Sequence, residues 1–133
     1  MKSSEIAVAA VMMLAVSSAN AAGFEGFFGN GFHYSVEIKK NADGTYKMEY
    51  GDSMGASNIL ECTGTGKLQG NKLVLVTDRD CTEYEIDDND NKKVTRKYQR
   101  AEKLEYVITA DGIDEYNSED PSDVTNLERV ELD

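Results

Sequence analysis

The chain has 133 residues, with 25 Asp and Glu against 14 Lys and Arg, which gives a formal net charge of -11 at neutral pH. Such a surface repels phosphate backbones and anionic lipid headgroups, so the composition disfavours binding to nucleic acid or to membrane surfaces. Cationic proteins and peptides are the partners that this charge favours.

The first 21 residues have the pattern of an export signal. An apolar run over residues 6–16 precedes the small residues Ala19 and Ala21, and it is shorter than the roughly 20 residues that a membrane-spanning helix needs. We therefore expect residues 1–21 to be a signal peptide cleaved near Ala21. The mature protein, residues 22–133, is expected to be a single domain without a membrane span, either periplasmic or secreted.

Residues 22–31 form a Gly/Phe-rich arm ahead of the first predicted strand. The arm holds Phe24, Phe27 and Phe28 among glycines. Aromatic side chains in such a segment either pack into one end of the domain and seal it, or form an exposed apolar patch that meets a partner. Both alternatives stay open, and the second makes Phe24, Phe27 and Phe28 candidate binding residues.

Residues 32–50 are predicted to form a β-hairpin. From Phe32 to Lys39, apolar and polar side chains alternate, which is the period of a strand with one buried face. The Asp43-Gly44 pair marks the turn, because glycine tolerates a positive φ without steric cost. The residues after the turn alternate again, so the two strands are expected to pair and to leave one face in water.

Eight further short runs with a strand pattern follow this hairpin. They cover residues 57–63, 66–69, 72–77, 81–86, 94–100, 103–109, 112–117 and 126–132. No long apolar stripe at helical spacing occurs after the predicted signal. The pattern predicts an all-β fold, a small antiparallel meander that closes into a single up-and-down β-barrel of about eight strands and so protects its edges.

The two cysteines of the chain, Cys62 and Cys81, are predicted to form a structural disulfide, because an exported protein folds in an oxidising compartment. If residues 70–71 are a tight turn, Cys62 lies opposite Arg79, two residues out of register with Cys81. Diagonal neighbours are about 7 to 8 Å apart, beyond the usual disulfide reach of roughly 4.4 to 6.8 Å between Cα atoms. A bulge or bend must therefore intervene. Its candidate positions are residues 64–66 and 78–80.

The sequence contains no pattern typical of catalysis. His33 is the only histidine, so one chain cannot build a zinc site from several histidines, and no serine-elbow motif accompanies it. The acidic run at residues 87–91 lacks the spacing and the turn glycine of a helix-loop-helix calcium site, and we expect a solvated loop there. We predict no catalytic residues, no metal and no cofactor, and a protein that is not an enzyme.

The export signal, the single disulfide and the small antiparallel meander are together similar to those of lipocalin-like barrels and of the periplasmic inhibitors of c-type lysozyme. The chain has no tryptophan, and with it lacks the lipocalin signature, so the resemblance assigns no functional residue. It implies a barrel that binds a protein or a small molecule.

We therefore expect a monomeric, noncatalytic binding protein whose acidic surface engages a cationic protein or peptide, for example as an inhibitor of a lysozyme or of a host-defence peptide. The alternative is a carrier that holds a small molecule in the barrel interior, where tyrosines would supply rings and hydroxyl groups. The tyrosines considered for this role are Tyr34, Tyr46, Tyr50, Tyr84, Tyr98 and Tyr106.

Overall fold

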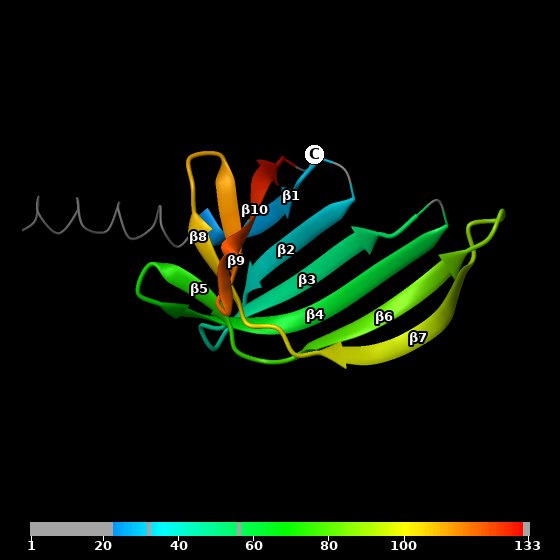
Figure 1. Ribbon diagram of the computed structural model, residues 1–133, viewed down its shortest axis with the longest axis horizontal. Helices are drawn as coiled ribbons and strands as arrows, with labels where there is room; N and C mark the ends of the chain where they lie inside the picture. The colour runs from blue at the N-terminus through cyan, green and yellow to red at the C-terminus, as the bar shows by residue number, and fades with distance from the viewer. Residues whose placement is uncertain (1–22, 32, 56, 132–133) are drawn as a thin grey trace, which may run out of the picture.

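The computed structural model describes residues 23–31, 33–55 and 57–131, so the predicted signal peptide and its cleavage point lie outside the described residues. Ten antiparallel strands make up the described part of the chain, and Figure 1 shows them as one twisted, curved sheet. The predicted all-β fold is confirmed. The strands are β1 (Gly26–Gly29), β2 (Tyr34–Lys40), β3 (Tyr46–Ser53), β4 (Asn58–Gln69), β5 (Lys72–Leu75), β6 (Arg79–Ile86), β7 (Lys92–Arg100), β8 (Leu104–Ile108), β9 (Gly112–Asn117) and β10 (Asp120–Val130).

Eight of these strands close into a barrel. They follow the order β3-β2-β1-β10-β9-β8-β5-β4, and the pairing of β4 with β3 completes the ring. The prediction of a closed antiparallel barrel of about eight strands is therefore confirmed. β1 lies in the wall between β2 and β10, so residues 26–29 of the predicted arm are a strand of the barrel.

The other two strands, β6 and β7, form an extension that leaves the barrel. The last four residues of β4, 66–69, pair with β5, whereas its first six residues, 58–63, pair with β6. β7 adds to the far side of β6, and β5 pairs onward with β8. The chain thus departs from a simple meander where the hairpin of β6 and β7 is inserted. In Figure 1 this extension projects to the right of the barrel.

The disulfide lies where the sheet divides between barrel and extension. Cys62 in β4 and Cys81 in β6 are directly opposed, their Cα atoms are 4.1 Å apart, and their sulfur atoms are bonded. β4 and β5 pair in the predicted register, so the shift of two residues arises in segment 76–78, between β5 and β6. The predicted disulfide is confirmed, and the bend begins just before the predicted site at residues 78–80.

Side chains of the barrel strands pack together inside the barrel. Alternate residues of the barrel strands are buried, including Val36 and Ile38 on the inward face predicted for β2. The largest fully buried side chains are Tyr46, Tyr106, Phe28, Ile38, Met48, Leu73, Ile113, Leu127 and Val36. Removing this apolar surface from water is the main stabilising contribution to the fold, and a barrel of this size can be completely filled in this way.

The segment before β1 is anchored to the barrel by Arg129 of β10. The guanidinium group of Arg129 donates hydrogen bonds to the carbonyl oxygens of Gly23 and Glu25, at 2.6 and 2.7 Å. It also lies 4.7 Å from the centre of the Phe28 ring. The positive charge of Arg129 is therefore directed at the N-terminal segment of the described chain.

Candidate functional site

Four polar side chains meet inside the barrel, and we call them the polar cluster. Tyr34 lies on β2, Tyr50 on β3, Tyr106 on β8 and Glu115 on β9. They point inward because each alternates in step with buried residues of its strand. Glu115, for example, is two positions after the buried Ile113.

A continuous chain of hydrogen bonds joins the polar cluster. The hydroxyl groups of Tyr34 and Tyr106 both donate to Oε2 of Glu115, at 2.7 and 2.6 Å. The hydroxyl oxygens of Tyr50 and Tyr106 are 2.7 Å apart. Because Tyr106 uses its single proton on Glu115, Tyr50 is the donor in this pair. The carboxylate of Glu115 is therefore the final acceptor of the whole chain.

A buried arginine lies beside the polar cluster. Arg79 is only 4% exposed, and its guanidinium group is 4.6 Å from the centre of the Tyr50 ring. Its Nη2 donates to Oε1 of Glu102 at 2.6 Å, and Arg100 contacts the same oxygen. Nε of Arg79 has no hydrogen-bond partner among the described residues. The cation–π contact and the ion pair together offset the cost of burying this charge.

The protonation states of the polar cluster follow from its burial. Burial raises the pKa of Glu115, while the hydrogen bonds from Tyr106 and Tyr34 and the charge of Arg79 partly oppose that rise. Burial also raises the pKa values of Tyr34, Tyr50 and Tyr106. The three phenols are therefore neutral hydrogen-bond donors at neutral pH, and the polar cluster offers recognition by hydrogen bonding without a tyrosinate nucleophile.

Glu115→Gln is expected to change how stability depends on pH. A raised pKa means that the folded protein binds the Glu115 proton more tightly than the unfolded chain does. The free energy of unfolding of the natural protein, relative to that of the variant, should therefore increase as the pH falls from neutral toward the unfolded value of about 4.3. Urea titrations at several pH values measure this difference.

Glu119→Gln is the matched control, because Glu119 is exposed in the turn between β9 and β10. The difference in the free energy of unfolding between the natural protein and Glu119→Gln should change much less with pH. The contrary result for Glu115→Gln is that the free energy of unfolding of the natural protein, relative to the variant, stays constant or decreases as the pH falls. Either outcome would show that the pKa of Glu115 is not raised in the folded protein.

A second candidate site is the acidic hairpin, which we define as residues 111–131: β9, β10 and the turns beside them. This segment contains eight acidic residues and one basic residue, Arg129. Apart from Glu115 in the polar cluster, its acidic residues lie at the surface. They are Asp111, Asp114, Glu119, Asp120, Asp123, Glu128 and Glu131.

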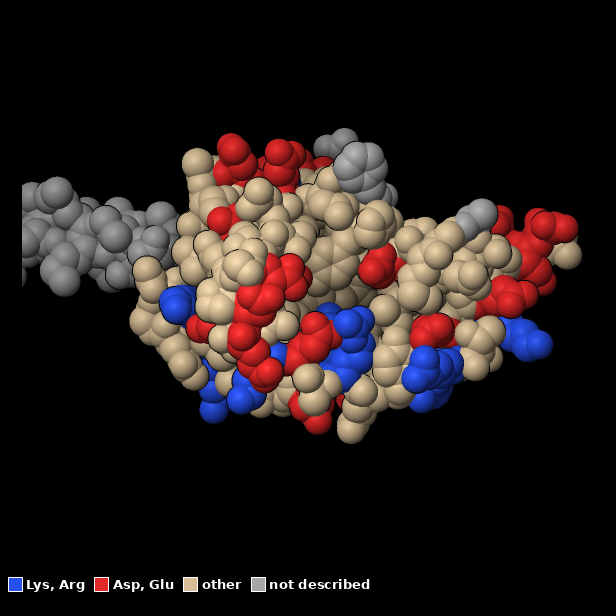
Figure 2. All heavy atoms as spheres, viewed as in Figure 1, with Lys and Arg blue, Asp and Glu red and all other residues tan. Residues whose placement is uncertain are grey.

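The charges of the acidic hairpin are not balanced by neighbouring cations. None of its seven surface carboxylates forms an ion pair with a described residue, and Arg129 points toward the segment before β1. Several acidic residues of other strands do have such partners; Glu49, for example, lies within 4 Å of both Lys39 and Lys47. Figure 2 shows acidic side chains gathered over β9 and β10, basic ones along the lower side of the extension, and a further acidic group at the outer end of the extension.

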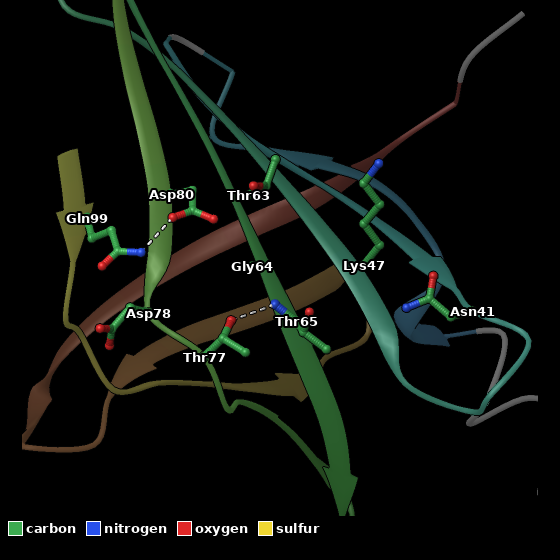
Figure 3. A pocket seen from close by; sticks show the side chains of 9 residues that line it. All are labelled: Asn41, Lys47, Thr63, Gly64, Thr65, Thr77, Asp78, Asp80 and Gln99. Atoms are coloured by element: carbon green, nitrogen blue, oxygen red, sulfur yellow. Dashed lines mark hydrogen bonds between the residues drawn. The ribbon is translucent and has the colours of Figure 1, made fainter. Parts of the chain in front are cut away.

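A polar pocket lies at the base of the extension, and Figure 3 shows the side chains that line it. They are Asn41, Lys47, Thr63, Gly64, Thr65, Thr77, Asp78, Asp80 and Gln99. Several of these groups already bond to one another: the hydroxyl of Thr77 accepts from the backbone N–H of Thr65 at 3.1 Å, and Gln99 donates to Asp80 at 2.9 Å. We assign no ligand to this pocket.

The predicted binding residues are mostly inside the protein. Phe24 and Phe28 are buried in the core, as in the sealing alternative, and Phe27 is half-buried on β1. The structure thus gives Phe24 and Phe28 a packing role, and a role of the three phenylalanines in binding stays a prediction.

The sequence interpretation identified the tyrosines of the polar cluster but not their carboxylate and arginine partners. Glu115 carried a usable signal, because it alternates in step with the apolar Ile113 in a predicted strand. Arg79 carried none, since its segment was predicted as a bend whose side-chain directions depend on local geometry. The tyrosines proposed for the interior fall into three groups. Tyr46, Tyr50 and Tyr106 belong to the core, Tyr34 and Tyr98 are partly buried and pack against it, and Tyr84 lies under Lys92 on the extension.

Comparison with known proteins found no matching family model, no matching curated protein and no matching solved structure. Within residues 23–131, apart from the two undescribed positions, no helix is long and apolar enough to cross a bilayer. Within the same residues, no group of three or more His, Cys, Asp or Glu side chains is placed to hold a metal ion. The polar cluster and the acidic hairpin are the two candidate functional sites of the described chain.

Proposed function

We propose that this protein is a noncatalytic binding protein and that its acidic hairpin engages a cationic protein or peptide. The observation that carries the proposal is the set of seven surface carboxylates without ion-pair partners among the described residues, in a segment whose single arginine is held elsewhere. A segment of this kind attracts positive charge along its whole length. An exported inhibitor of a basic enzyme, such as a lysozyme, or of a host-defence peptide fits this description.

The expected energetics are those of electrostatic steering. Carboxylates at the surface contribute little individually in water, but a concentration of like charges raises the association rate of an oppositely charged partner. β9 and β10 pair continuously over five residue positions, from Val124–Tyr116 to Glu128–Gly112, and the register shifts between Asp120 and Val124. Most of the carboxylates are therefore presented by a paired hairpin and not by a loose tail. The scaffold therefore presents the charges without a large ordering cost on binding.

Neutralising three acidic residues of the hairpin should weaken binding to a cationic partner. We expect Asp114→Asn, Asp123→Asn and Glu128→Gln together to raise the Kd for a c-type lysozyme or a Lys/Arg-rich peptide by about tenfold at low salt. Calorimetric titrations of the oxidised protein measure the change. Binding of the natural protein should also weaken as salt is raised, because exposed charges are screened.

The control variant removes the same charge from the far end of the molecule. Glu85→Gln, Asp88→Asn and Asp90→Asn neutralise exposed residues at the tip of the extension, which Figure 1 shows on the side opposite to β9 and β10. If this control weakens binding as much as the hairpin variant does, the protein attracts cations through its net charge and the acidic hairpin is not the site.

A small-ligand carrier is the second candidate function, and the polar cluster favours it. A carboxylate and three phenols arranged in one hydrogen-bonded chain are suited to fixing the orientation of a small polar molecule. The fully buried side chains around Tyr46 and Tyr106 fill the adjoining interior. A ligand would therefore occupy the end of the barrel near Tyr34 and not its centre, and native mass spectrometry of the purified protein would detect a retained molecule.

A further inference from the structure

The strand β7 ends the sheet on its outer side. In the strand order it is the last member, and it pairs with β6 alone among the described strands. It is nine residues long and exposed along most of its length. In Figure 1 β7 follows the lower rim of the extension. One edge of its backbone is therefore available for pairing with another strand.

The side chains of β7 are basic although the protein as a whole is strongly acidic. Five of its nine residues are cations. They are Lys92, Lys93, Arg96, Lys97 and Arg100. Lys93 and Lys97 form no ion pair with a described residue, and Arg96 is 3.7 Å from Glu83 in the neighbouring strand. These cations are thus only partly neutralised within the protein.

The arrangement of β7 presents its charges on both faces of the edge. Arg96, Tyr98 and Arg100 are paired with Glu83, Cys81 and Arg79, so they lie on the face of the sheet that carries the disulfide. Lys97 alternates with them and lies on the opposite face. An additional strand along this edge would therefore meet positive charge on either side, whichever way its side chains alternate.

The edge is also held in place before any partner arrives. β6 and β7 pair over eight residue positions, and Cys81, opposite Tyr98, is covalently joined to Cys62 of the barrel strand β4. The guanidinium group of Arg96 lies 4.3 Å from the centre of the Tyr98 ring. A strand fixed in this way loses little conformational entropy when another strand pairs with it.

We propose that β7 binds an extended acidic peptide segment of a partner protein, which adds to the sheet as a further strand. Backbone hydrogen bonds along the edge would supply affinity, and alternate carboxylates of the peptide would contact the cations of β7. This site is separate from the acidic hairpin and does not depend on the function proposed for that hairpin. It gives the protein a second surface, of the opposite charge, for a different partner.

Two simpler roles of the basic edge would give different binding results. Lysines on an edge strand also prevent sheets from joining edge to edge. If this is the only role of the basic edge, backbone hydrogen bonds would add nothing to the affinity of an acidic peptide. A basic strip could instead attract any polyanion, including single-stranded nucleic acid, through counterion release alone. The experiment must therefore separate strand addition from simple attraction between charges.

The test is a fluorescence anisotropy titration of the oxidised protein with a labelled peptide as long as β7, in which Glu alternates with Thr and Val. A second peptide of the same sequence is methylated at every backbone nitrogen of its central residues, which removes the donors for strand pairing on both edges and keeps the charge. We expect Lys93→Gln with Lys97→Gln, and separately the backbone methylation, each to weaken binding by about tenfold.

The control variant is Lys39→Gln with Lys47→Gln, a pair of opposed lysines on β2 and β3, and it should bind as the natural protein does. The hairpin variant with Asp114, Asp123 and Glu128 neutralised should not weaken binding either, which keeps this test separate from the previous one. The proposal is overturned if the peptide does not bind, if the methylated peptide binds equally well, or if single-stranded DNA of equal charge binds as tightly.

Discussion

Replacing Gly112 with alanine is expected to lower the free energy of unfolding by about 3 kcal/mol, because the barrel strands approach too closely there for a side chain. A Cβ atom at Gly112 would lie 2.1 Å from the carbonyl oxygen of Leu127 and 2.9 Å from the backbone nitrogen of Arg129. These are backbone atoms of β10, so relief requires β9 and β10 to move apart. Chemical denaturation with urea measures the loss.

Gly29→Ala is the matched control, since Gly29 also lies in a strand of the barrel wall. A Cβ atom there would be 3.4 Å from the carbonyl oxygen of Tyr34, which is an ordinary contact. We expect a change of less than about 1 kcal/mol. If Gly112→Ala is tolerated as well as Gly29→Ala, the close approach of β9 and β10 is not a feature of the protein in solution.

Removing the disulfide by Cys62→Ala with Cys81→Ala is expected to lower the free energy of unfolding by about 3 kcal/mol. The two residues are 19 positions apart in the sequence, so the bond restricts a loop of the unfolded chain. Alanine at both positions avoids leaving a free thiol in the buried site. Thermal and urea unfolding of the oxidised protein and the double variant provide the comparison.

The loss of the disulfide should also have a local effect. The bond joins β4 to β6 where the extension leaves the barrel, so amide hydrogens of β6 and β7 should exchange faster in the variant, while those of β9 and β10 change less. Equal stability of the variant and the natural protein, or a uniform increase in exchange, would contradict the role of the disulfide as the anchor of the extension.

The strand pattern predicted much of the barrel because a barrel wall has one buried and one wet face. The hairpin of β2 and β3 was predicted correctly, and its turn contains Gly44 with a φ of 90°. The disulfide and the shift of register next to it were also predicted, because a fixed reach between two Cα atoms limits how two strands can pair. These predictions depend on local geometry, which short stretches of sequence specify.

Other features depend on contacts between distant segments, and the sequence did not reveal them. The two runs at residues 57–63 and 66–69 are one strand, β4, which is shared between the barrel and the extension. The predicted arm supplies β1, because its edges pair with β2 and β10 and its Phe28 enters the core. Neither outcome follows from alternation within the segment itself.

The candidate sites show the same division. The excess of acidic residues is visible in the composition. That the surface carboxylates of β9 and β10 have no ion-pair partner among the described residues is visible only in the structure, where the ion pairs lie on other strands. The basic residues near β7 were visible in the sequence too, but their place on an outer edge is a property of the strand order. The protein thus carries two surfaces of opposite charge on separate parts of one sheet.

The most direct test of the proposed function is an NMR titration of the isotope-labelled, oxidised protein with a Lys/Arg-rich peptide. We predict that the amide signals that shift most belong to residues 111–131, and that the shifts disappear when Asp114, Asp123 and Glu128 are neutralised. Shifts that cluster instead around Tyr34 and Glu115, or that spread evenly over the acidic residues of the whole protein, would contradict the acidic hairpin as the binding site.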